Sequence, residues 1–400
     1  MSAFSDIITF SRASAAWRFN SAGVLEQVPA NQPRFDYDPV TRVLKGLLVE
    51  EQRTNLFTYS EDFSNGAWVK GTLTTVEPSS ASWPTGGFMQ KLVETTANDL
   101  HSVYQSRTVT ASSPYVLSLH MGQGERRYAA LNIGTSRNQC VVAVFDLQTG
   151  VVVRSFTNGN TFAFVAAGII NCGGGVYRPW VCATTPAGAT SAIPAVWLIP
   201  DELVNSNIPS YAGDGTSGIY VAGGSFEAGT FPTSYFRTTS AQATRAADVA
   251  SVNTLSPWFN PDEGTIFFEG SPISVAGPVK RAAALTNGTQ QNRIVLDLAA
   301  NSGIAEYLAT AAGVSMASIT SSAVSAGSVI KMAGVYSASD YRMAAKGVLG
   351  AGPAPGGAVP TITKLELGAL VGAQFFNGHI RRVRYFPRRL TNAELQALTA

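Results

Sequence analysis

The segment "CVVAVFDLQTGVVVRSF", residues 140–156, indicates most clearly how this 400-residue chain folds. Two valine-rich runs flank the turn residues 147–150. Valine is enriched in strands, and two such runs joined by a short polar turn are typical of an antiparallel hairpin. The segment therefore predicts two paired strands.

Similar strands continue on both sides of this hairpin, from about residue 53 to residue 240. In "SPYVLSLHM", residues 113–121, apolar side chains alternate over Tyr115, Leu117 and Leu119. "SGIYVAGGSFEAG", residues 217–229, is the last strand of the series. Strands at roughly ten-residue spacing with glycine and asparagine between them predict a β-sandwich over residues 53–240.

A second sandwich is predicted over residues 255–400, after a polar, small-residue linker at 241–254. Its short strands include "GTIFFEGSP" and "RIVLDLA", and "GAGPAPGGAVP", residues 350–360, is a loop by composition. Near the end, Ile380 is out of phase with Val383 and Tyr385, which predicts a bulge near Arg381 and Arg382.

The two ends of the chain differ from the sandwiches. Residues 1–52 read as an extended arm with hairpins, too small to hold a core, which should pack on a neighbouring domain or subunit. At the other end, Thr391 and Glu394 form a capping-box pattern that predicts one short helix. The predicted fold class is all-β, with two tandem antiparallel sandwiches.

Composition excludes several classes of function. Charged residues make up 14% of the chain, below the usual ~25%, so small polar residues fill the polar positions, as suits β-rich modules or surfaces buried between copies. The net charge of +2 gives no reason to expect nucleic acid. No apolar run reaches the ~18 residues that span a bilayer, and the N-terminus lacks a secretion-signal pattern, so we expect cytoplasmic synthesis and no membrane insertion.

The three cysteines, Cys140, Cys172 and Cys182, are an odd number and include no CxxC. They are interpreted as small buried hydrophobic residues, with a Cys172–Cys182 bridge as the alternative.

Several segments together resemble a known family. "GLLVEEQRTNLFTYSEDFSNGAW", residues 46–68, and "YAGDGTSGIYVAGGSFEAGTFPTSYFRT", residues 211–238, resemble the entry and closing strands of a jelly-roll module in tail-fibre, spike and related structural proteins of tailed bacteriophages. "ANQPRFDYDPVTRVLKGLLVEE", residues 30–51, is similar to the arm that precedes it. "FFNGHIRRVRYFPRRLTNAEL", residues 375–395, resembles the end of a concanavalin A-like, laminin G-like sandwich.

The resemblance implies an attachment arm (1–52), a carbohydrate-binding-module-like jelly roll (53–240), a linker (241–254) and a concanavalin A/laminin G-like sandwich (255–400). It also implies a virion location, a homotrimer, and contact with other virion proteins through the arm. Where the family has Gln-Leu-Glu, this chain has Ser225-Phe226-Glu227, which lacks the side-chain amide.

Carboxylates do not form a recognisable catalytic pair. A glycosidase needs two carboxyl groups roughly 5–10 Å apart. Glu263 and Glu269 lack the middle acid of the alternating pattern of concanavalin-like hydrolases, and Glu50 and Glu51 are adjacent, so a strand would point them to opposite faces. We expect no enzyme and no required cofactor. Turn and cap chemistry is one interpretation of Glu61 and Asp62. A structural calcium ion held by Glu61, Asp62 and Glu227, as in related jelly rolls, is the other.

Glycan-binding candidates are aromatic rings and arginines in polar surroundings. Trp83 lies in the polar loop "SASWPTGG" and is either a stacking ring or a cover for the sandwich end. The remaining candidates are Tyr104, Arg126, Arg127, Tyr128, Arg382 and Arg384. The arginines are either ligands for an acidic glycan or solvated edge and salt-bridge residues.

The sequence thus predicts a non-enzymatic fibre or spike protein that binds a bacterial surface polysaccharide for adsorption. A purely structural collar, baseplate or capsid-decoration protein is the alternative, and a polysaccharide depolymerase ranks below both.

Overall fold

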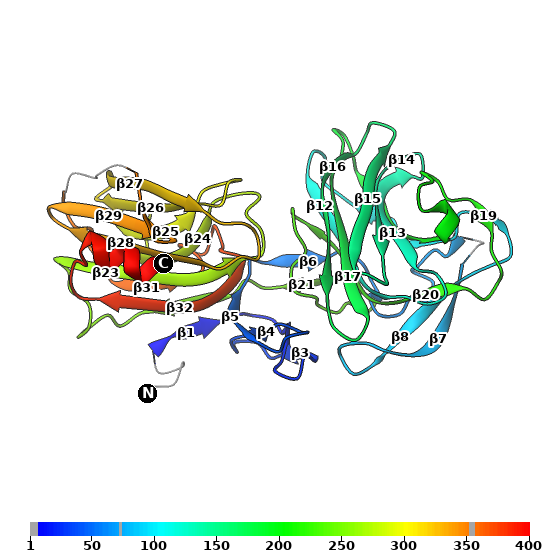
Figure 1. Cartoon of the computed structure of the whole chain (residues 1–400), viewed down its shortest axis with the longest axis horizontal. Helices are drawn as coiled ribbons and strands as arrows, with labels where there is room; N and C mark the ends of the chain where they lie inside the picture. The colour runs from blue at the N-terminus through cyan, green and yellow to red at the C-terminus, as the bar shows by residue number, and fades with distance from the viewer. Residues whose placement is uncertain (1–6, 72–73, 352–356) are drawn as a thin grey trace.

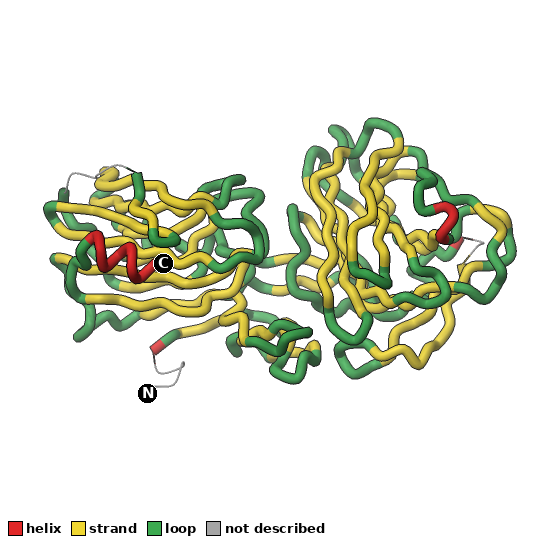
Figure 2. The backbone as a smooth tube through the Cα atoms, viewed as in Figure 1, coloured by secondary structure: helices red, strands yellow, loops and turns green. Residues whose placement is uncertain are grey.

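The computed structural model describes residues 7–71, 74–351 and 357–400. Within these ranges the chain is built almost entirely from antiparallel strands, with one short helix at the C-terminal end (Figure 2). The predicted all-β fold class is confirmed. Residues 1–6 of the expected arm and residues 352–356 of the expected 350–360 loop lie outside the described ranges.

The first sandwich, on the right in Figure 1, has two sheets that face each other. The β12 sheet has the order β16 (Ala163–Asn171), β17 (Val176–Thr184), β12 (Pro114–Gly122), β20 (Gly218–Ala228), β8 (Phe88–Glu94), β7 (Thr74–Ser82). The β13 sheet has the order β10 (Ser102–Tyr104), β18 (Ser191–Ile199), β13 (Tyr128–Ser136), β14 (Gln139–Asp146), β15 (Val151–Asn158), and β11 (Arg107–Thr108) also pairs with β18. Smaller elements are β9 (Asn98–Asp99) with β19 (Tyr211–Ala212), and the 3-10 turn η2 (Asp201–Leu203).

The hairpin predicted from residues 140–156 is the β14–β15 pair, in which Val142 faces Phe156. Side chains from both sheets fill the space between them, including Leu117, Leu131 and Val181, all fully buried. Tyr115, Leu117 and Leu119, the alternating apolar residues of β12, all belong to this core, as the sequence predicted.

The second sandwich, on the left in Figure 1, also has two sheets. One has the order β30 (Val348–Leu349), β29 (Asp340–Ala345), β28 (Ile330–Ser337), β23 (Glu263–Pro272), β32 (Gly378–Phe386), β5 (Leu44–Val49), β4 (Phe35–Tyr37). The other has the order β1 (Thr9–Ser11), β22 (Val249–Val252), β31 (Lys364–Leu367), β24 (Lys280–Thr286), β25 (Arg293–Leu298), β26 (Ile304–Ala311), β27 (Val314–Ala323). The bulge predicted near Arg381 and Arg382 is confirmed, because Glu269 faces Arg382 while Gly270 faces Ile380.

The arm is not a separate unit. Strands β1, β4 and β5 belong to the sheets of the second sandwich, and Leu48 on β5 faces His379 on β32. The hairpin of β2 (Ala16–Phe19) and β3 (Leu25–Val28) leaves this body and packs against the first sandwich, where Leu25 joins a buried cluster with Trp83. Most of the arm expected over residues 1–52 therefore belongs to the second sandwich, because backbone pairing joins β1 to β22 and β5 to β32.

The expected linker, 241–254, also contains strands. β21 (Ala243–Arg245) pairs with β6 (Arg53–Asn55), and these two short strands cross together between the sandwiches (Figure 1). β22 then enters the second sandwich. The first sandwich is thus inserted between the strands of the second.

The helix α2 (Asn392–Thr399) is the predicted C-terminal helix. The Thr391 side chain accepts a hydrogen bond from the Glu394 backbone N–H, and Glu394 accepts one from the Thr391 backbone N–H, so the capping box is confirmed. No helix among the described residues is long and apolar enough to cross a membrane.

Candidate functional site

The place where the arm, the first sandwich and the second sandwich meet is organised by a buried charge network. It consists of Arg12, Arg34, Glu50, Arg245 and Asp248, whose side chains are all inaccessible to solvent. Arg34 Nη2 lies 2.8 Å from Glu50 Oε2 and 2.5 Å from Asp248 Oδ2, and Arg12 Nη1 lies 3.0 Å from Asp248 Oδ1. The network ties residues from the arm to residues that follow the first sandwich.

Glu50 also holds the first sandwich. Its Oε1 accepts a hydrogen bond from the Ser234 backbone N–H at 2.8 Å, and its Oε2 accepts one from the Ser234 hydroxyl at 2.6 Å. Burial alone would raise the pKa of Glu50, but Arg245, Arg34 and the Ser234 hydrogen bonds outweigh burial and hold the pKa well below its ordinary value. Glu50 is therefore a structural carboxylate.

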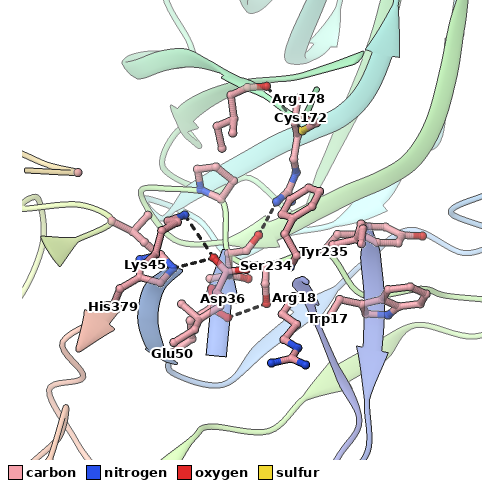
Figure 3. A pocket seen from close by; sticks show the side chains of 18 of the residues that line it. Trp17, Arg18, Asp36, Lys45, Glu50, Cys172, Arg178, Ser234, Tyr235 and His379 are labelled. Carbon is pink, nitrogen blue, oxygen red and sulfur yellow. Dashed lines mark hydrogen bonds and ion pairs between the residues drawn. The ribbon is translucent and has the colours of Figure 1, made fainter. Parts of the chain in front are cut away.

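Beside this network lies a pocket of about 300 Å³, here called the junction pocket (Figure 3). Trp17 and Leu25 come from the arm hairpin, Ile170 and Tyr235 from the first sandwich, and His379 from the second. Most of the wall is apolar, and Figure 3 shows Asp36, Lys45 and His379 together on one side of it. The pocket therefore exists only when all three parts are assembled.

Asp36 and His379 form the polar side of the junction pocket. His379 Nε2 lies 2.8 Å from Asp36 Oδ2, and Lys45 Nζ lies 3.3 Å from the same oxygen. Burial lowers the pKa of His379 and outweighs the neighbouring Asp36. Burial alone would raise the pKa of Asp36. The effects of His379 and Lys45 outweigh burial, so the pKa of Asp36 lies below its ordinary value. The pair is thus a neutral imidazole donating to a carboxylate at neutral pH.

Arg178 and His120 line another wall. Arg178 donates from Nη1 to the Thr233 carbonyl at 2.6 Å and from Nη2 to the Ser118 hydroxyl at 2.9 Å. His120 is 1% exposed, and burial together with the nearby Arg178 lowers its pKa to about 3. This imidazole therefore stays neutral throughout the physiological range.

Two groups of the junction pocket, Cys172 and His120, are poorly suited to proton transfer at neutral pH. Burial raises the pKa of the Cys172 thiol to about 12, so the thiol is protonated at neutral pH. An efficient general acid or base has a pKa near the working pH, and His120 lies far from it. The three cysteines are free and buried, so the alternative of a Cys172–Cys182 bridge is wrong.

A second hollow, of about 440 Å³, lies on the first sandwich at the start of β8 and is called here the Phe88 groove. Phe88 is 69% exposed, which makes it the most exposed large apolar side chain among the described residues. Glu61 Oε2 lies 3.0 Å from Arg237 Nε, and Glu61 Oε1 accepts a hydrogen bond from the Tyr235 hydroxyl at 2.9 Å. An exposed ring beside a planar ion pair is an arrangement that can hold a sugar.

Trp83, the leading sugar-stacking candidate, also borders this groove but is only 6% exposed. Its ring packs edge-on against Tyr235 and His120, with 5.6 Å between ring centroids in each case. The arm hairpin helps to bury it, which the polar surroundings in sequence do not reveal. Trp83 is thus buried under the arm hairpin, and Phe88 is the ring that reaches solvent.

The other glycan candidates do not converge. Arg126 and Arg127 are bound by the carboxylates of Glu94 and Asp146, at 2.5 Å each. The Arg127 guanidinium lies 5.1 Å from the centre of the Tyr128 ring. Tyr104, half-buried, exchanges backbone hydrogen bonds with Val69.

The C-terminal arginines lie on the other sandwich. Arg382 is exposed on β32 and 3.9 Å from Glu269, and Arg384 is also exposed on β32. Arg382 and Arg384 are therefore on the second sandwich, whereas the Phe88 groove is on the first. The candidates predicted from the sequence do not form one site.

The three expected calcium ligands have separate partners. Asp62 accepts hydrogen bonds from Ser64, and Glu61 binds Tyr235 and Arg237. Glu227, fully buried, accepts from the Thr233 backbone N–H and hydroxyl. Within the described ranges, no three His, Cys, Asp or Glu side chains are grouped as a metal site. Calcium therefore stays a prediction without a ligand cluster.

Several functional candidates were missed by the sequence reasoning. Asp36 and His379 are 343 positions apart, and Arg178 reads as an ordinary strand residue. One feature of the sequence could have indicated that Phe88 is exposed. Phe88 follows Gly86 and Gly87 in a turn, where an aromatic ring has little to pack against.

No protein-family model matches the chain, and no curated protein matches it. Among solved structures, Ruminococcus gnavus IT-sialidase CBM40 is 18% identical, covers 35% of this chain and 84% of that chain, and has a TM-score of 0.30. A SAP-like pentraxin from Limulus polyphemus is 13% identical, covers 37% and 79%, and has a TM-score of 0.29. Mouse laminin alpha1 domains LG4-5 are 10% identical, cover 86% and 92%, and have a TM-score of 0.26. At these identities and TM-scores, the similarities assign neither a family nor a ligand to this chain.

Proposed function

We propose that this protein is a non-enzymatic fibre or spike protein of a tailed-phage virion, and that its first sandwich binds a host surface glycan through the Phe88 groove. The observation that carries the binding role is the exposure of the Phe88 ring beside the Glu61–Arg237 pair. A sugar would stack its apolar face on the ring and exchange hydrogen bonds between its hydroxyls and the pair.

The virion role is supported by the resemblance of residues 30–68 and 211–238 to phage structural proteins. The protein would be made in the host cytoplasm and exposed on the particle surface. Attachment to other virion proteins through the arm is supported by the turn between β4 and β5, where Val40, Val43 and Leu44 are 51%, 60% and 46% exposed. A homotrimer would present three grooves, and multivalency can add ~100- to 10,000-fold to weak single-site binding.

The test is a glycan array probed with the full chain, followed by titration of any positive glycan. We expect Phe88→Ala to weaken binding by about tenfold or more, because it removes the stacking ring. Phe164→Ala is the matched control, since Phe164 is 41% exposed on β16, outside the groove. Undiminished binding by the Phe88→Ala variant would refute the assignment.

The structural alternative, a collar, baseplate or capsid-decoration protein, is favoured by one feature. Strands β15 and β16 are sheet edges that expose apolar side chains, including Val151, Phe164 and Ile170 at 48%, 41% and 40%. An exposed apolar edge is a template for another chain. If the full chain binds none of the acidic and neutral glycans on the array, this alternative is favoured.

A further inference from the structure

The walls of the junction pocket are too apolar for a typical sugar site. Trp17 and Tyr235 lie with ring centroids 6.1 Å apart, and Leu25, Leu48, Ile170 and Ile273 also contribute to the apolar part of the lining. A volume of about 300 Å³ is at the small end of the range for ligand pockets. The shape and lining therefore fit a compact apolar or aromatic group.

The charges around the pocket do not balance. Five side-chain cations lie in the network and the pocket wall: Arg12, Arg34, Lys45, Arg178 and Arg245. Four carboxylates accompany them: Asp36, Glu50, Glu227 and Asp248. The two histidines of the pocket have pKa values lowered by burial, so they add no charge at neutral pH. Arg18 at the rim is already paired with Glu26 at 2.8 Å. The cluster therefore carries one excess positive charge.

Of these five cations, Lys45 and Arg178 are the two that line the junction pocket. Arg178 is 6% exposed and donates hydrogen bonds only to neutral oxygens, while the buried carboxylates of Glu227 and Glu50 act on it electrostatically without forming an ion pair with it. Lys45 shares a single carboxylate oxygen of Asp36 with His379. Both cations line the junction pocket together with Cys172.

Burying a charge without a counter-ion is costly, and the cost is recovered when an anion binds beside it. We propose that the junction pocket binds a small apolar group that carries one carboxylate. The apolar body contacts Trp17 and Tyr235, and the carboxylate lies toward Lys45 and Arg178. This site is separate from the Phe88 groove and does not depend on the glycan-binding proposal.

Such a ligand has two sources with the same chemistry. One is a free organic acid, and the other is the apolar C-terminal residue of another protein, whose terminal carboxylate would enter the pocket. Benzoate represents the first source, and N-acetylphenylalanine represents the second. Benzamide and N-acetylphenylalaninamide are their neutral counterparts of nearly equal shape.

Calorimetric titration of the full chain with these four probes tests the proposal. We expect both acids to bind at least about tenfold more tightly than their amides, because only the acids supply the missing charge. A more than tenfold advantage of N-acetylphenylalanine over benzoate identifies a chain terminus as the natural occupant, and the reverse identifies a free acid. Equal binding of acids and amides, or no binding at millimolar concentrations, overturns the proposal.

Variants separate the site from non-specific binding. Lys45→Met should weaken acid binding by about tenfold without unfolding the protein, since its side chain is 34% exposed. Lys346→Met, at an exposed lysine of the second sandwich outside the pocket, is the control and should bind as the parent does. Arg178→Gln should abolish the preference for acids, provided that its thermal unfolding shows a folded protein. Unchanged acid binding by the Lys45→Met variant would also overturn the proposal.

Discussion

Acidification should destabilise this protein through His120, a residue with no role in either proposed site other than packing. The imidazole is 1% exposed, and its Nδ1 lies 3.4 Å from the Gly223 carbonyl. Trp83 and Tyr235 present their edges to it, and the positive charge of Arg178 is close. Burial is the main reason that the pKa of His120 falls to about 3, and repulsion by Arg178 is the second.

The size of the effect follows from the two pKa values. In the unfolded chain a histidine has a pKa of about 6.5. Below that pH the histidine is therefore protonated in the unfolded state but stays neutral in the folded state. The free energy of unfolding therefore falls as the pH drops below about 6.5 and continues to fall until the pH reaches the folded pKa of about 3. At pH 5 the loss from His120 alone is about 2 kcal/mol, or 1.4 kcal/mol for each of roughly 1.5 pH units.

Urea unfolding followed by tryptophan fluorescence, at pH 7.5 and at pH 5.0, measures this loss. His120→Gln is the matched variant, because its amide N–H can still donate to the Gly223 carbonyl while it cannot be protonated. His379 also lowers the free energy of unfolding on acidification, but it does so in both proteins, so its contribution cancels in the comparison. We expect the variant to lose about 2 kcal/mol less than the parent between the two pH values. Equal losses, or an NMR titration of the His120 ring with a midpoint near 6.5, would refute the reasoning.

Three further predictions concern the packing that holds the site. Glu50→Gln should lower the free energy of unfolding by about 3–5 kcal/mol, because it leaves three buried arginines of the network with Asp248 as their remaining ion-pair partner. Arg18→Gln, which breaks a partly exposed pair, should cost less than about 1 kcal/mol, and urea unfolding compares the two. The three buried cysteines should resist a thiol reagent at pH 8 in the folded protein and react fully in urea, since burial raises each thiol pKa to about 11 or 12. Gly46→Ala should lower the melting temperature, because φ is +126° and the new Cβ would lie 2.4 Å from the Ile380 carbonyl oxygen.

The local features of the fold could be predicted because each depends on neighbouring residues. The hairpin at 140–156 follows from two valine-rich runs and a turn, and the capping box follows from two residues three positions apart. The bulge in β32 could be inferred because a strand with a fixed period of two cannot place Ile380 and Val383 on one face otherwise.

The pairing of strands that are far apart in the chain could not be predicted from the sequence. Nothing in "LKGLLV", residues 44–49, indicates that it pairs with residues 378–380 of the last strand. The same limit applies to the site. Trp83 was expected in a polar loop, and it is buried because the arm hairpin, more than 50 residues earlier, covers it. Phe88 and the Asp36–His379 pair became visible only when distant elements were placed together.

The insertion of one sandwich into the other explains the role of Glu50, the first carboxylate of residues 50–62. Glu50 directly follows β5, a strand of the second sandwich, and binds Ser234, which follows the last strand of the first. Asn55, five residues later, donates to the Gly224 carbonyl and accepts from the Phe226 backbone N–H inside the first sandwich. Because the chain leaves the second sandwich here and returns through the paired strand β21, these contacts hold both crossings together. The segment therefore joins the two sandwiches, and Glu50 is its counter-ion in the buried network at that joint.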